Sequence, residues 1–115
     1  MNLSTQAQEI LDILKDLAED QRTSSFIEEY DGVNWLSMTN VLNGHVEAPD
    51  DYKEKLDILS DKLNGYLITP DGHHSKIYYE LRRAGYRLRT GESDSFGPLS
   101  AVIVCPYADW SVCYG

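Results

Sequence analysis

Residues 73–105 read HHSKIYYELRRAGYRLRTGESDSFGPLSAVIVC, and this order of residue types predicts a helix followed by two strands. Apolar residues recur at helical spacing from Ile77 to Ala84, so they form one face of a helix. Gly85 ends this helix, because glycine readily adopts the left-handed conformation of a C-terminal cap.

The two strands follow directly. Tyr86 to Thr90 alternates apolar and polar side chains, as a half-buried strand does. Leu99 to Cys105 is apolar and β-branched, which is typical of a buried strand. Between them, Gly91 to Gly97 has the polar, glycine-flanked composition of a loop. We therefore expect a helix that leads straight into a β-hairpin.

Positive charge gathers on the same stretch, where five of the ten Lys and Arg residues of the chain lie. Lysine and arginine bind phosphates, and arginine also reads base edges. We therefore predict a nucleic-acid-binding surface, although the same residues could equally form a solvated helix whose arginines pair with acidic residues elsewhere. The predicted surface consists of Lys76, Tyr79, Arg82, Arg83, Arg87 and Arg89.

A basic helix followed by a hairpin resembles the second half of a winged helix-turn-helix, over residues 75–90, SKIYYELRRAGYRLRT. In that family the helix enters the major groove and the hairpin, called the wing, touches the DNA backbone. The resemblance implies that double-stranded DNA is the partner. It would place Arg83 and its helical neighbours in or near the groove, and Arg87 and Arg89 on phosphates.

A second pattern, TSSFIEEYDGVNWLSMTNVLNGH, covers residues 23–45 and predicts two short helices joined at Asp31-Gly32. It resembles the repressor-type helix-turn-helix of bacteria and phages, through Gly32-Val33 and Leu42-Asn43-Gly44. The resemblance implies a small, phage-type regulator of transcription. The chain departs from that family at Glu28, where a small residue is usual, and the second helix carries no Lys or Arg. The alternative is a helical hairpin that packs Trp35, Met38, Val41 and Leu42 into the core.

The remaining chain predicts further helices and short strands. Leu3 to about Asp20 is an amphipathic helix that Ser4 or Thr5 caps, and Tyr52 to Leu63 is another that Asn64-Gly65 ends. Tyr66 to Thr69 and Ser111 to Tyr114 are predicted strands. We therefore expect a single α+β domain over residues 1–115. Its acidic part, residues 1–64, holds three to four helices, and residues 65–115 add a helix and a small antiparallel sheet.

Net charge argues against a nucleic-acid partner, because it is −9 with an isoelectric point near 4.6. Residues 1–72 carry 15 acidic and 5 basic residues, whereas residues 73–115 carry 4 and 5. The alternative function is an acidic interaction protein that mimics nucleic acid in a basic groove of a partner, similar in size and charge to short phage proteins that inhibit host nucleases. Its candidate residues are Glu19, Asp20, Glu28, Glu29, Asp31, Glu47, Asp50 and Asp51.

Other classes of function find little support. The sequence has no apolar run long enough for a membrane span or a signal peptide, so we expect a cytosolic protein that does not bind membranes. Cys105 and Cys113 would be free thiols there, with a cross-strand disulfide as the alternative. The adjacent His73 and His74 have no partners at metal-ligand spacing. We expect no metal, no cofactor and no enzymatic activity, and leave a homodimer open.

Overall fold

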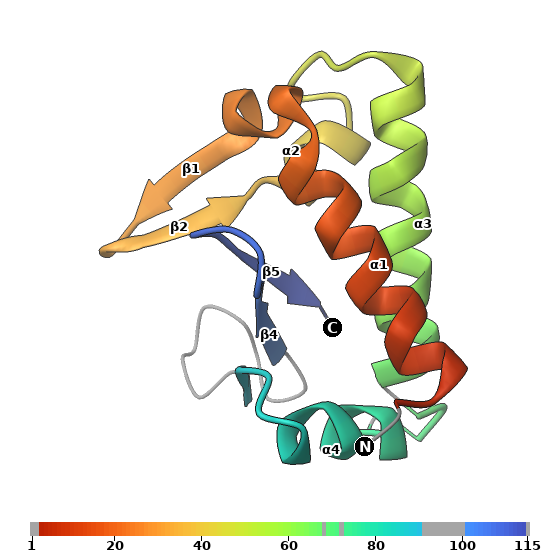
Figure 1. Ribbon diagram of the computed structural model, residues 1–115. Helices are drawn as coiled ribbons and strands as arrows, with labels where there is room; N and C mark the ends of the chain where they lie inside the picture. Colours follow the sequence, from red (N-terminus) through yellow and green to blue (C-terminus); the bar gives the residue numbers. More distant parts are fainter. Residues whose placement is uncertain (1–2, 68, 72, 91–100, 115) are drawn as a thin grey trace.

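The computed structural model describes residues 3–67, 69–71, 73–90 and 101–114. Two long antiparallel helices, α1 (Thr5–Glu19) and α3 (Asp50–Leu67), lie side by side next to a sheet, as Figure 1 shows. A shorter helix, α4 (Lys76–Arg83), lies across the end where α1 begins and α3 ends. The α+β class predicted from the sequence is therefore confirmed.

The two long helices form because their apolar residues repeat every three or four positions. Ser4 caps α1, since its hydroxyl accepts a hydrogen bond from the Ala7 N–H at 3.3 Å. Asp50 and Asp51 lie in the first turn of α3, where negative charge stabilises a helix. The buried residues of the pair are Ala7, Ile10, Leu11, Leu14 and Leu17 on α1, and Tyr52, Leu56, Leu59, Leu63 and Leu67 on α3.

The described strands form a five-stranded sheet in the order β1 (Ile27–Tyr30), β2 (Val33–Leu36), β5 (Ser111–Tyr114), β4 (Ala101–Val104) and β3 (Leu88–Thr90). The strands β3 (Leu88–Thr90), β4 (Ala101–Val104) and β5 (Ser111–Tyr114) are antiparallel neighbours. A second hairpin, made of β1 and β2, joins them through one parallel pair, Trp35 with Ser111. The predicted strands near the C-terminus are thus present, whereas the predicted loop from Gly91 to Gly97 lies outside the described residues.

The predicted helix-turn-helix over residues 23–45 is wrong. A 3-10 helix, η1 (Gln21–Phe26), leads into an antiparallel hairpin of β1 (Ile27–Tyr30) and β2 (Val33–Leu36). Its two turn residues, Asp31 and Gly32, have φ values of 54° and 80°. Two positive φ angles give a turn whose twist matches a hairpin, and Asp-Gly is a favoured pair for it. Only α2 (Met38–Leu42) is helical in the second half of the segment.

The predicted end of α3 is also wrong, because the helix continues through Asn64-Gly65 to Leu67. Leu67 is fully buried, and the Tyr66 hydroxyl donates a hydrogen bond to Glu9 Oε2 at 2.8 Å. These contacts outweigh the cost of one glycine within a helix, which is about 1 kcal/mol. Tyr66 and Leu67 are therefore helical, and the predicted strand is not formed there.

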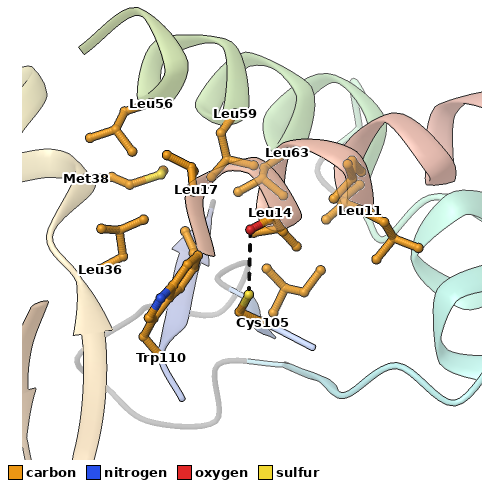
Figure 2. Close-up of a cluster of buried hydrophobic side chains, with 14 of the residues drawn as sticks. Leu11, Leu14, Leu17, Leu36, Met38, Leu56, Leu59, Leu63, Cys105 and Trp110 are labelled. Atoms are coloured by element: carbon orange, nitrogen blue, oxygen red, sulfur yellow. Dashed lines mark hydrogen bonds between the residues drawn. The ribbon is translucent and has the colours of Figure 1, made fainter. Parts of the chain in front are cut away.

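The core lies between the two long helices and the inner side of the sheet, as Figure 2 shows for Leu14, Leu59 and Trp110. On α2, Val41 is fully buried, whereas Leu42 is only partly buried. Cys105 is a buried free thiol, as predicted, and its Sγ–H donates to the Leu14 carbonyl at 3.9 Å. Within the described residues, no helix is both long and apolar enough to span a membrane.

Candidate functional site

Helix α4 is anchored firmly at one end of the molecule. Tyr78 and Leu81 are fully buried, and Ile77 packs partly buried against the same core. The Ser75 hydroxyl caps the helix by accepting from the Tyr78 N–H at 3.3 Å, and it donates to the Tyr66 carbonyl of α3. Gly85 has a φ of 95°, which confirms the predicted C-terminal cap. The outer side chains of α4 are therefore carried on a fixed helix.

The outer side of α4 and the residues that follow it are basic. Lys76, Tyr79 and Arg83 are exposed, as their helical spacing predicts. Arg89 lies on β3, but its side chain is outside the described residues. We call the exposed described set the basic face, and it consists of Lys76, Tyr79, Arg82, Arg83 and Arg87.

Within the described part of the chain, no carboxylate forms an ion pair with a cation of the basic face. Arg82 instead contacts Tyr78, with Nη1 3.4 Å from the hydroxyl and the guanidinium carbon 5.8 Å from the ring centroid. Glu80 of the same helix is occupied elsewhere, because its Oε1 accepts from the Ser4 N–H at 2.6 Å. Among the described residues, the cations of the basic face therefore have no acidic partner.

An aromatic cluster supports the basic face from beneath. The His74 ring stacks on the Tyr78 ring with centroids 4.0 Å apart and planes at 10°. The Tyr79 ring meets Tyr78 edge-on, at 5.1 Å and 88°. Burial, with smaller effects from Arg82 and His73, lowers the pKa of His74, so this ring is neutral near pH 7. The cluster was not predicted, because stacking of His74 depends on the turn before α4.

Two of the acidic candidates hold the fold together. Asp20 lies between Arg22, at 2.8 Å, and Lys55, at 3.1 Å, and its side chain is only 8% exposed. Arg22 also pairs with Asp51 at 2.8 Å. Hydrogen bonds from Arg22 hold the pKa of Asp20 far below its usual range. Asp20 and Asp51 therefore link η1 to α3, and the Asp51 side chain stays 66% exposed while it does so.

The other acidic candidates are exposed, and three of them lie on the β1–β2 hairpin. Glu28 and Glu29 are on β1, and Asp31 is in the turn next to Tyr30, which is 69% exposed. In Figure 1 this hairpin extends away from the long helices towards the left of the view, whereas α4 lies at the bottom. The exposed acidic set consists of Glu19, Glu28, Glu29, Asp31, Glu47 and Asp50.

A pocket beside η1 is lined by polar side chains that already have partners. A pocket of about 430 Å³ lies between η1 and the turn before β5, lined by Asp20, Thr23 and Trp110 among others. Its Asp20 is paired with Arg22 and Lys55, and the Thr23 hydroxyl donates to the Leu17 carbonyl at 2.6 Å. Within the described residues, no group of three or more His, Cys, Asp or Glu is placed to hold a metal ion.

Comparisons with the profiles of known protein families, with curated proteins and with solved structures found no match for this chain.

Proposed function

We propose that the chain binds nucleic acid through the basic face of α4 and the start of β3. The observation that carries this proposal is that Lys76, Arg83 and Arg87 are exposed with no ion-pair partner among the described residues. Exposed lysines and arginines bind a phosphate backbone by releasing its condensed counterions, which favours association at low salt. Cations that are already paired with carboxylates would gain much less.

Stabilisation of helix α4 by positive charge explains only some of the cations of the basic face. Arg82 and Arg83 lie in the last turn of α4, where positive charge stabilises the helix. Lys76, however, lies in the first turn, where a cation is unfavourable, and Arg87 lies beyond the helix. Their positions fit a shared external partner better than they fit helix stability.

Part of the strong negative charge lies far from the basic face, because the acidic start of α3 is at the other end of that helix from α4. The eighteen residues of α3 span roughly 27 Å between the acidic Asp50 end and the end that meets α4. The Debye length at physiological salt is about 8 Å, so repulsion from that distant acidic end is largely screened. The described carboxylates close in sequence to the basic face are Asp71 and Glu80, and Glu80 is hydrogen-bonded to Ser4.

The test is a fluorescence anisotropy titration with a labelled oligonucleotide at several salt concentrations. The double variant Lys76→Ala/Arg83→Ala should flatten the slope of log affinity against log salt concentration by about 1.4–1.8. This is the change expected for the loss of two phosphate contacts. Lys15→Ala/Lys53→Ala removes the same charge from α1 and α3, so it is the matched control and should leave the slope unchanged. Equal effects of the two variants, or no binding at low salt, would contradict the proposal.

A second candidate function is the acidic interaction protein, and the β1–β2 hairpin is the feature that favours it. Glu28, Glu29 and Asp31 are close to Tyr30 in sequence on a projecting hairpin, and an exposed tyrosine is a frequent anchor at protein interfaces. In this alternative, a basic nucleic-acid-binding protein would be retained by the chain. The double variant Glu28→Lys/Glu29→Lys would then release that protein in a pull-down, whereas Lys76→Ala/Arg83→Ala would not.

A further inference from the structure

Tyr79 lies in the middle of the basic face and is 49% exposed. Lys76 is three residues before it, and Arg82 and Arg83 are three and four residues after it, so all four lie on neighbouring positions of one helical surface. Lys76 and Arg83 are about 10 Å apart along the helix axis, one on each side of the ring. The arrangement is an aromatic ring flanked by cations at both ends.

The Tyr79 ring is also held in place before any partner arrives. It contacts the ring of Tyr78 edge-on at 5.1 Å, and the ring of His74 at 6.5 Å with planes at 79°. Tyr78 is fully buried, so it provides a fixed support for the exposed ring. A side chain that is already ordered loses little conformational entropy when a ligand packs on it.

We propose that the ligand of this surface is single-stranded nucleic acid, with one base stacked on Tyr79 and the adjacent phosphates bound by Lys76 and Arg83. This inference rests on the proposed function and adds the class of nucleic acid. Bases in a duplex are stacked on each other and cannot offer a face to a tyrosine, whereas bases in a single strand can. Stacking of a base gives the Tyr79 ring a role among the cations. Phosphate binding alone would not use this ring.

The hairpin found in place of the predicted helix-turn-helix also favours a single-stranded ligand. Residues 27–36 form a hairpin, so no second helix from that segment accompanies α4 into a major groove. Helix α4 itself has eight residues, and its exposed side carries an aromatic ring at its centre. A surface built in this way suits a strand whose bases are exposed.

The experiment compares four labelled ligands of equal length by anisotropy at low salt: oligo-dT, oligo-rU, a DNA duplex and an abasic sugar–phosphate strand. Both single strands should bind more tightly than the duplex and the abasic strand, and the oligo-dT and oligo-rU results show whether DNA or RNA is preferred. Tyr79→Leu should weaken single-strand binding about 5- to 140-fold and leave abasic binding unchanged. Tyr79→Phe, which keeps the ring, should bind more tightly than Tyr79→Leu.

The matched control is Tyr30→Leu, the same substitution at an exposed tyrosine of the β1–β2 hairpin, and it should bind like the parent protein. Circular dichroism verifies that each variant is folded. If the duplex binds as tightly as the single strands and Tyr79→Leu changes nothing, this inference is wrong while the proposed function stands. If none of the four ligands binds, the proposed function fails, and this inference fails with it.

Discussion

Two groups of basic residues in this molecule have opposite surroundings. Near η1, Arg22 and Lys55 meet around the carboxylate of Asp20, at 2.8 Å and 3.1 Å. On α4, Lys76 and Arg83 are exposed and pair with no described carboxylate. The first group joins elements that are distant in sequence, so its role is structural. Among the described residues, the second group forms no such link, and we propose that it serves contacts with a partner.

The largest effect should come from removing the charge at the centre of the first group. Asp20→Asn leaves Arg22 and Lys55 facing a neutral amide in a largely buried position. We expect the free energy of unfolding to fall by about 2–3 kcal/mol, measured by urea denaturation. Nucleic-acid binding by the folded fraction should not change. A loss below about 0.5 kcal/mol would break the distinction between the two groups.

Acid should weaken the same group in the parent protein. The pKa of Asp20 is lowered in the folded state, so its contribution is complete above the unfolded value, near 3.9. Stability should therefore fall as the pH drops from about 5 towards the lowered pKa. Urea denaturation of parent and Asp20→Asn proteins across this range provides the measurement. The difference between their unfolding free energies should shrink with falling pH, and a constant difference would contradict the assignment.

A smaller effect is expected at the edge of the first group. Asp51 also pairs with Arg22, at 2.8 Å, but its side chain is 66% exposed. Water and salt weaken such a pair, so Asp51→Asn should destabilise the protein much less than Asp20→Asn does. Denaturation at low and high salt tests this, since the cost should decrease as salt is added. If Asp51→Asn were as damaging as Asp20→Asn, burial would not be what separates these two carboxylates.

The smallest change in stability should come from the second group. Arg83→Ala removes an exposed side chain with no described ion pair, so the free energy of unfolding should stay within about 0.5 kcal/mol of the parent value. The log–log slope of oligonucleotide affinity against salt concentration should nevertheless flatten, by the roughly 0.7–0.9 expected for one lost phosphate contact. A large loss of stability would show that Arg83 belongs with Arg22 and Lys55.

Local patterns predicted the parts of the fold in which one periodicity is clear. Helix α1 has a capping residue, Ser4, and a long apolar stripe, and α4 has Ser75 before it and Gly85 after it. The segment around Asp31-Gly32 was ambiguous because its apolar runs are short, and short runs fit a helix or a strand. The Asp-Gly pair is the hairpin signal in this segment, and it predicts the observed structure better than the resemblance to a repressor motif does.

The basic face could be predicted from the sequence, but its lack of ion pairs could not. Helical spacing places Lys76 and Arg83 on the outer side of α4 without knowledge of the fold. Pairing depends on which carboxylates other elements bring near, as when Arg22 meets Asp51, 29 residues further along the chain. For the same reason, Asp20 and Asp51 could not be told apart from the exposed acidic residues before the packing of η1 on α3 was known.

The most direct test of the central claim is a map of the binding surface by ¹⁵N NMR. Addition of a short single-stranded oligonucleotide at low salt should shift backbone amide signals from about residue 74 to residue 90. Signals of η1, of the first turns of α3 and of the β1–β2 hairpin should stay in place. Shifts centred on residues 27–36, or no shifts with either a single strand or a duplex, would contradict the assignment of nucleic-acid binding to the basic face.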